Sequence, residues 1–303
     1  MDLSAPFRGV RQRSSAQSEP IDENEPLARD RVAYARVRRL AEAYATIMHP
    51  DAFFVGLTAV ALLELPLPWR FDAHSPLSVA VPPPHRAPRG SGIRGHRFSQ
   101  RQMAARTCDG LRVAVPADLW ASLAGTLTER ELIILGDAIV RIPRDRDGAP
   151  QPEQQLATIP ELEAAARRPG RRRRVELLRA CSRVRMGSMS ALETDCRLTM
   201  EDAGLPEPEL DVEILDARGR LIGISDAIYR RWGVVVEVEG RHHSTSDAQW
   251  SRDLDKYAAY AAVGLELVRL ASKHIRGPRP RGPEIVRAVL QRRGWRPEAS
   301  SAQ

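Results

Sequence analysis

The last third of the chain has a hydrophobic pattern that predicts seven elements in the order α-β-β-β-α-β-α. The valine run in GVVVEVEGRHH is typical of a buried strand, and apolar residues three or four apart predict the helices. The short links DARGR and RRWG make the first three strands antiparallel neighbours. The predicted elements are a helix at 190–203, strands at 210–215, 221–229 and 233–239, a helix at 247–262, a strand at GLELVRL and a helix at 283–293.

The first half of the chain predicts a separate mixed α/β domain, so the fold class is α/β (α+β). Thr128 and Glu131 stand at the positions of a capping box, which marks the start of one helix. The predicted elements are helices at 29–49 and 52–65, a strand at LSVAVPPP, a small sheet within 90–115, and helices at 116–123, 128–141 and 158–168.

Composition shifts along the chain divide it into five parts. A polar, Pro- and Ser-rich start predicts a flexible arm, and PRDRDGAPQPEQQ predicts a linker. The expected parts are an arm at 1–25, an N-terminal domain at 26–145, a linker with a basic helix at 146–185, a C-terminal domain at 186–296 and a tail at 297–303.

Charge and cysteine usage narrow the class of protein. The 303 residues carry a formal charge of +7, which favours acidic partners and nucleic acid first. Arginine supplies nearly all of the positive charge. Because an arginine surplus also follows from a GC-rich genome, the charge alone is weak evidence for a nucleic-acid partner. The three cysteines form no C-x-x-C, so a reducing cytoplasm is expected. No apolar run predicts a signal peptide or a membrane span, and we expect no membrane association.

The run RRPGRRRR is the densest positive charge in the chain. Its Arg171, Arg172, Arg173 and Arg174, together with Arg241, could grip nucleic-acid phosphates. The alternative, a solvated turn and helix start, is the more common fate of such runs. A Gly- and Pro-rich stretch contains four more arginines, Arg86, Arg89, Arg94 and Arg97. They could likewise contact phosphates or form a solvated surface loop.

Two neighbouring predicted strands carry acidic residues: the strand at 233–239 ends in Glu237 and Glu239, and the strand at 221–229 has Asp226 amid apolar residues. Strand alternation puts Glu237 and Glu239 on one side, and the RRWG link brings Asp226 beside them. Two carboxylates roughly 5 Å apart repel by about 3 kcal/mol at an effective dielectric constant near 20. Either one takes up a proton or a cation lies between them. Oxygen ligands suit Mg²⁺ or Mn²⁺, so these three acids are predicted to hold such an ion.

These motifs resemble the very-short-patch-repair endonuclease-like domains of the PD-(D/E)xK nuclease superfamily. The marks are SALETDCR, GLPEPELDVEI, SDAIY, VVVEVEGRHH, DLDKYAAYAAVGLELVRL and the closing GW, over roughly the last third of the chain. The resemblance implies a restriction-endonuclease-like core and a Mg²⁺-dependent cut in DNA, with Asp226 and Glu237 as metal-binding acids. In similar domains an acid on the first helix joins the metal site, which makes Glu193 a further ligand.

The sequence departs from the superfamily at one position, where Glu239 replaces the signature lysine. Lys256 on the following helix could supply the missing charge, or it could pair with Asp253 on the surface. His243 is a candidate general acid or base, and otherwise a polar loop residue. Ser190 and Glu193 also fit a capping box. No cysteine or third histidine lies at zinc-ligand spacing near these residues.

The region 6–144 is similar to the AbiEi-like antitoxin-type regions that precede such nuclease domains, through PFRGVR, GLTAVALLELPLP, RGHR and LIILGDAIVR. The leading hypothesis is therefore a metal-dependent DNA endonuclease in repair, mobile-element or phage-defence biology. The alternatives are a non-catalytic, antitoxin-like DNA- or protein-binding regulator and a scaffold that binds no nucleic acid. A homodimer and a second protein partner both stay open.

Overall fold

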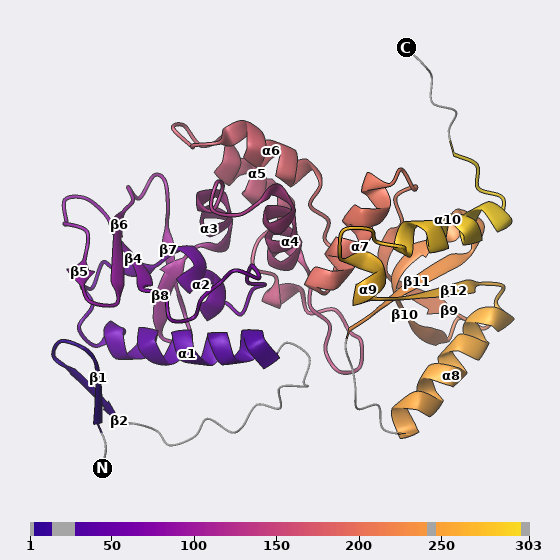
Figure 1. Cartoon of the computed structure of the whole chain (residues 1–303), viewed down its shortest axis with the longest axis horizontal. Helices are drawn as coiled ribbons and strands as arrows, with labels where there is room; N and C mark the ends of the chain where they lie inside the picture. The colour runs from indigo at the N-terminus through magenta and orange to yellow at the C-terminus, as the bar shows by residue number, and fades with distance from the viewer. Residues whose placement is uncertain (1–2, 14–27, 241–246, 298–303) are drawn as a thin grey trace. The chain divides into compact units, whose positions relative to one another are not determined.

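The computed structural model describes residues 3–13, 28–240 and 247–297, and the chain forms two compact units (Figure 1). The N-terminal unit contains the chain up to Val140 together with Leu156–Val184. The C-terminal unit contains Arg141–Gln155 and the chain from Arg185 onward. Residues 146–185, predicted as a linker with a basic helix, are therefore divided between the two units.

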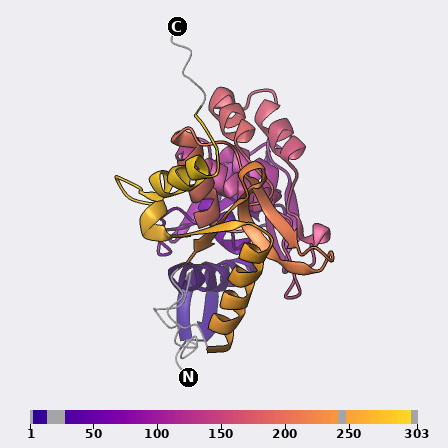
Figure 2. The ribbon, with the colours of Figure 1, turned by 90° about the vertical axis from the view of Figure 1, so that its right-hand side faces the viewer.

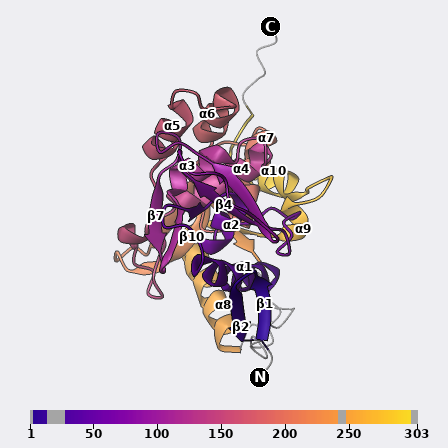
Figure 3. The ribbon, with the colours of Figure 1, turned by 90° about the vertical axis from the view of Figure 1, so that its left-hand side faces the viewer.

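The N-terminal unit is built on a mixed six-stranded sheet with the order β5-β6-β4-β3-β8-β7. Figure 3 labels β4 and β7 of this sheet. Its elements are β1 (Leu3–Phe7), β2 (Val10–Arg13), α1 (Ala28–Ala45), β3 (Phe53–Phe54), α2 (Gly56–Leu62), β4 (Leu77–Val81), β5 (Arg89–Gly90), β6 (Ile93–Arg97), β7 (Ala105–Cys108), β8 (Leu111–Ala114), α3 (Pro116–Ser122), α4 (Glu129–Val140), α5 (Ile159–Arg167) and α6 (Arg174–Ser182). Residues of α1, α2 and the central strands share one buried apolar cluster.

Two predictions for this unit were wrong in part. The expected flexible arm begins with the antiparallel β1–β2 hairpin, which is anchored because Phe7 and Val10 are buried and the Phe7 ring meets Tyr44 of α1 at 5.1 Å. The helix expected at 52–65 is divided into β3 and α2. Gly56 has a φ of +59°, a conformation that costs a glycine little, and it lets the chain turn out of β3 into α2.

Capping residues set the helix starts as expected. Thr128 Oγ1 accepts from the Glu131 amide at 3.3 Å, and Glu131 Oε2 accepts from the Thr128 amide at 2.8 Å, which is the predicted capping box before α4. Thr158 and Glu161 repeat the arrangement before α5.

The C-terminal unit has the predicted order of elements, with two additional short helices, α9 (Ser272–Ile275) and a 3₁₀ helix at Arg230–Trp232. Its later segments are the orange and yellow ribbons of Figure 2. Its four-stranded sheet has the order β12-β11-β10-β9, in which the first three strands are antiparallel and β12 is parallel to β11. The elements are α7 (Ala191–Asp202), β9 (Glu209–Leu215), β10 (Leu221–Tyr229), β11 (Val234–Glu239), α8 (Asp247–Ala262), β12 (Glu266–Ala271), α9 (Ser272–Ile275) and α10 (Gly282–Arg292).

Alternating residues of β11 belong to two separate apolar clusters. Val234 and Val236 pack with α7 and α10, whereas Val235 packs with Tyr260 of α8. The sheet therefore has helices on both faces, as expected for a strand that reads as a continuous valine run.

The core of the C-terminal unit yields a stability prediction. Leu270 of β12 is fully buried in the cluster with α7 and α10, so we expect Leu270→Ala to lower the free energy of unfolding by about 2–5 kcal/mol through lost burial and a cavity. Denaturant unfolding measures this. Leu221→Ala, at a leucine that is 51% exposed, is the matched control and should change it by less than about 0.5 kcal/mol.

Candidate active site

The two inner strands of the C-terminal sheet separate at one end, and Asp226 stands at the point of separation. β10 and β11 pair over three positions that end at Ala227 and Val236, while β11 stays paired with β12 as far as Glu239. Asp226 Oδ2 accepts a hydrogen bond from the Val238 amide at 2.6 Å. The carboxylate thus takes the role of the missing ladder partner, which fixes its position.

Glu237 is the residue across from Asp226, because the register pairs Ala227 with Val236 one step earlier. Its Oε1 accepts from Lys256 Nζ at 2.9 Å and from the Tyr260 hydroxyl at 3.4 Å, both on α8. Lys256 Nζ also donates to the Ile224 carbonyl at 3.2 Å. A Cβ at Gly223 would come within 2.8 Å of Lys256 Cε, so the absent side chain makes room for this lysine.

Burial and the negative charge of neighbouring acids raise the pKa of both Asp226 and Glu237. The pKa of Asp226 rises to about 7, first through burial and then through the negative charge of Glu193. The pKa of Glu237 also rises to about 7, first through burial and then through Asp226, and Lys256 opposes the rise. One lysine therefore faces several acids in a poorly solvated place, which favours uptake of a proton or a cation.

Glu193 caps the start of α7, while its role as a metal ligand stays a prediction. It lies in the first turn of α7, where its amide donates to Ser190 Oγ at 3.2 Å and its carboxylate accepts from the Met189 amide at 2.7 Å. Burial, and then the charge of Asp211, raises the pKa of Glu193. The cap thus holds an acid close enough to Asp226 to act on its charge.

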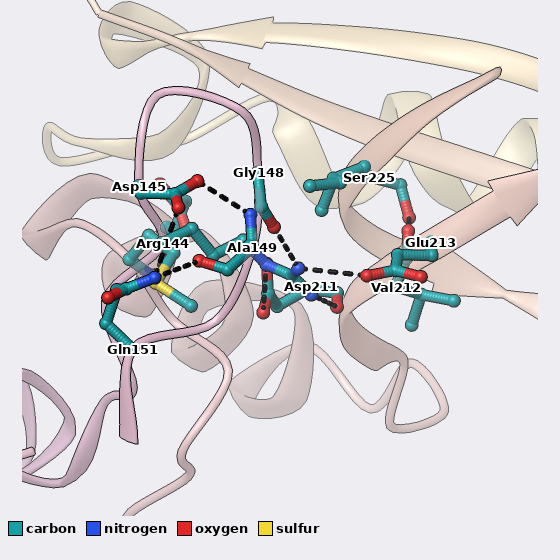
Figure 4. A network of polar contacts seen from close by, with 12 residues as sticks. Arg144, Asp145, Gly148, Ala149, Gln151, Asp211, Val212, Glu213 and Ser225 are labelled. Atoms are coloured by element: carbon teal, nitrogen blue, oxygen red, sulfur yellow. Dashed lines mark hydrogen bonds and ion pairs between the residues drawn. The ribbon is translucent and has the colours of Figure 1, made fainter. Parts of the chain in front are cut away.

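A hairpin from residues 141–155 places Arg144 beside two acids of β9, Asp211 and Glu213 (Figure 4). Arg144 Nε donates to both oxygens of Asp211 at 2.9 Å, and a terminal nitrogen donates to Glu213 Oε1 at 3.0 Å. The same side chain donates to the Gly148 carbonyl at 2.6 Å. Burial raises the pKa of Asp211 and Arg144 opposes the rise, so the arginine favours the ionised carboxylate.

Asp145 organises that hairpin from within. Its Oδ1 accepts from the amides of Asp147 and Ala149, both at 2.9 Å, and its Oδ2 accepts from Gln151 Nε2 at 3.1 Å (Figure 4). The tight turn explains how a segment without regular structure holds Arg144 in one position.

The predicted convergence of three carboxylates was wrong for Glu239. This residue forms an ion pair with Arg269 on the adjacent strand, and the Arg269 guanidinium lies 4.9 Å from the centre of the Tyr257 ring. Within the described ranges, oxygens of Asp226, Glu237 and Glu239 do not all lie within 4.8 Å of one another. The arginine neutralises Glu239 and holds it on the β12 side, away from Asp226.

The other predicted site residues are distributed as follows. Lys256 contacts Glu237, as one of its two predicted roles requires. The side chain of Asp253, its alternative partner, lies outside the described residues, and so do His243 and Arg241. Arg171 is partly buried and donates to the Gln102 carbonyl at 2.8 Å, and its phosphate contact stays a prediction. Arg173 pairs with Glu176, and Arg172 and Arg174 are exposed.

Sequence reasoning missed Arg144 and Asp211. Arg144 lies in a segment predicted as a linker, 67 residues from its partner, and no local pattern connects them. Asp211 carried a weak signal, since it interrupts a predicted strand, and its φ of +52° shows that the strand is irregular there.

Comparisons with family models, characterised protein sequences and solved structures find no match to this chain. Across the described residues, no helix is both long and apolar enough to cross a membrane.

We expect Arg144→Met to lower the free energy of unfolding by about 1.5–3 kcal/mol, because it leaves Asp211 partly buried without its charged donor. Urea unfolding measures the loss. The control is Arg230→Met on the equally bidentate but exposed pair with Glu209, where a loss of at most about 1 kcal/mol is expected. Equal losses for both variants would contradict a special role for Arg144.

The raised pKa of Asp226 predicts a pH dependence of stability in EDTA. Between the ordinary pKa near 4 and about 7, the folded state binds more protons than the unfolded state, so stability falls as the pH rises. Asp226→Asn keeps an acceptor for the Val238 amide but removes this titration. The free energy of unfolding of this variant should exceed that of the wild type by roughly 1–3 kcal/mol at pH 8 and should equal it near pH 4. A constant difference across that range, measured by urea unfolding, would contradict the raised pKa.

Proposed function

We propose that the C-terminal unit is a metal-dependent DNA endonuclease of the PD-(D/E)xK type. The observation that carries this proposal is the arrangement of Asp226, Glu237 and Lys256 where β10 and β11 separate. Two partly buried acids face each other and a lysine contacts one of them at 2.9 Å. The predicted order of elements and the resemblance in SDAIY and VVVEVE support the same assignment.

The donor set fits a hard divalent cation. Asp226 and Glu237 would hold Mg²⁺ or Mn²⁺ through oxygen alone, with water and substrate phosphate as further ligands. Among the described residues, oxygens of Glu193, Asp226 and Glu237 do not all lie within 4.8 Å of one another, so Glu193 would act on the site through its charge. When bound, such an ion polarises a phosphate and lowers the pKa of its water. The acids that repel one another without a cation would then be stabilised in their ionised form.

Lys256 is proposed to replace the lysine that the signature places at position 239. Its ammonium reaches Glu237 from α8 rather than from β11. Lys256 would stabilise the charge that develops on the phosphate during hydrolysis. The Tyr260 hydroxyl, also on α8, orients Glu237.

DNA is the proposed substrate because the chain carries a formal charge of +7 and the site suits phosphodiester chemistry. Arg172 and Arg174 of the N-terminal unit are exposed and remain candidates for phosphate contacts. Cytoplasmic localisation follows from the same function and stays a proposal.

A second candidate is a non-catalytic DNA- or protein-binding regulator that retains the fold. The observation in its favour is that Lys256 and Arg269 already balance Glu237 and Glu239 without a metal. Such a protein would bind DNA equally well with and without Mg²⁺.

Plasmid cleavage in Mg²⁺ or Mn²⁺ tests the endonuclease. We expect wild-type protein to nick or linearise DNA and EDTA to abolish the activity. Asp226→Asn and Lys256→Met should each lower the rate at least about 100-fold, since several kcal/mol of transition-state stabilisation is lost. Gel shifts in Ca²⁺ should show that both variants still bind DNA.

Glu266→Gln is the matched control, because Glu266 lies on the same sheet at the opposite end of β12 and pairs with Arg292. Its rate should equal that of the wild type. DNA binding without metal-dependent cleavage would favour the regulator, and cleavage that survives Asp226→Asn would exclude this site.

A further inference from the structure

Two turns of the N-terminal unit meet at one end of its inner strands β3 and β4. β3 and β4 are antiparallel, with Phe53 opposite Ala80 and Phe54 opposite Val79. The turn that precedes β3 therefore faces the turn that follows β4. The flanking residues Ala52, Phe53 and Val81 are buried, so the positions of both turns are set by the core.

Three metal-ligating side chains converge between these turns. His49 and Asp51 come from the first turn and His85 from the second, and one ligand atom of each lies within 4.8 Å of the others. His85 Nε2 lies 3.1 Å and His49 Nδ1 lies 4.0 Å from Asp51 Oδ2. The two imidazole rings are 4.2 Å apart between centroids.

Backbone hydrogen bonds hold both turns in this arrangement. The Ala52 amide donates to the His49 carbonyl at 2.8 Å, and the His85 amide donates to the Pro82 carbonyl at 3.1 Å. The Asp51 amide donates to His49 Nδ1 at 3.1 Å, so that nitrogen acts as an acceptor and carries no proton. An unprotonated imidazole nitrogen is the form that binds a metal ion.

Two imidazoles and one carboxylate are a donor set for first-row transition metals. Such ligands bind zinc at about 2.0–2.2 Å, which places neighbouring ligand atoms about 3.3 Å apart in a tetrahedral site. The 3.1 Å and 4.0 Å separations require only small side-chain movements to reach that value. All three side chains are partly exposed, at 46%, 55% and 37% for His49, Asp51 and His85, which leaves room for water as the remaining ligand.

We propose that His49, Asp51 and His85 bind a divalent transition-metal ion of the zinc class. The imidazole nitrogens separate this site from the oxygen-only acids of the C-terminal unit, which suit Mg²⁺. Binding would exchange the hydrogen bonds at His85 Nε2 and His49 Nδ1 for metal bonds, with each imidazole carrying its proton on the other ring nitrogen. The site needs no activity of the C-terminal unit.

The chain offers a matched control in the same unit. His74 and Asp72 form an exposed pair with 3.2 Å between Nδ1 and Oδ1. Within the described residues no third ligand joins them. This pair therefore offers one histidine and one carboxylate but lacks the third ligand side chain that a metal site requires.

Calorimetric titration of the full chain with ZnCl₂, after removal of any histidine tag, tests the proposal. We expect one Zn²⁺ per chain, undisturbed by a tenfold excess of Mg²⁺. His85→Ala and Asp51→Ala should each weaken binding at least about tenfold, because each removes one of three protein ligands. His74→Ala and Asp226→Asn should retain wild-type affinity, and circular dichroism should show that all variants fold.

The proposal is overturned if wild-type protein binds no Zn²⁺, or if His85→Ala and His74→Ala bind it with equal affinity. Because Asp226→Asn removes the proposed nuclease site alone, loss of cleavage with retained Zn²⁺ binding separates the two proposals.

Discussion

The burial of Asp226 beside Glu237 is the constraint on which the C-terminal site depends. β10 and β11 cannot continue their ladder past Ala227 and Val236, and the Asp226 carboxylate accepts the amide that this separation leaves without a partner. The same hydrogen bond holds the Asp226 carboxylate in a poorly solvated position opposite Glu237. Burial then raises both pKa values to about 7, and the site gains a preference for positive charge.

Cations from distant parts of the chain bind acids of this sheet at two places. Lys256 donates directly to Glu237, and Arg144 binds Asp211 and Glu213 on the edge strand β9. The Arg144 hairpin belongs to the C-terminal unit although α5 and α6 follow it in sequence and belong to the other. Residues 141–155 are thus part of the architecture around the acids, and a C-terminal fragment that began at residue 186 would lack that arginine.

The sequence predicted what local periodicity and short links determine. The valine run and the RRWG link were enough for the strands, their antiparallel order and the approach of Asp226 to Glu237. Contacts over long separations were not predictable in this way. Arg144 reaches Asp211 across 67 residues, and Arg269 draws Glu239 away through the parallel pairing of β11 with β12, which no short link sets. The hairpin at 3–13 was missed because its two buried side chains are a small signal in a polar stretch.

The same limit explains why the cluster of His49, Asp51 and His85 has no sequence signature. Zinc motifs are read from ligands a few residues apart, whereas these come from turns that only the pairing of β3 with β4 brings together. The two candidate sites therefore share one structural feature, which is that polar residues lie where the pairing of two strands ends. They differ in the ligand atoms that they offer to a metal. Partly buried carboxylates where β10 and β11 separate would favour a hard ion and phosphate. Exposed imidazoles beyond β3 and β4 would favour a softer ion, so the two proposed metals are expected to bind independently of each other.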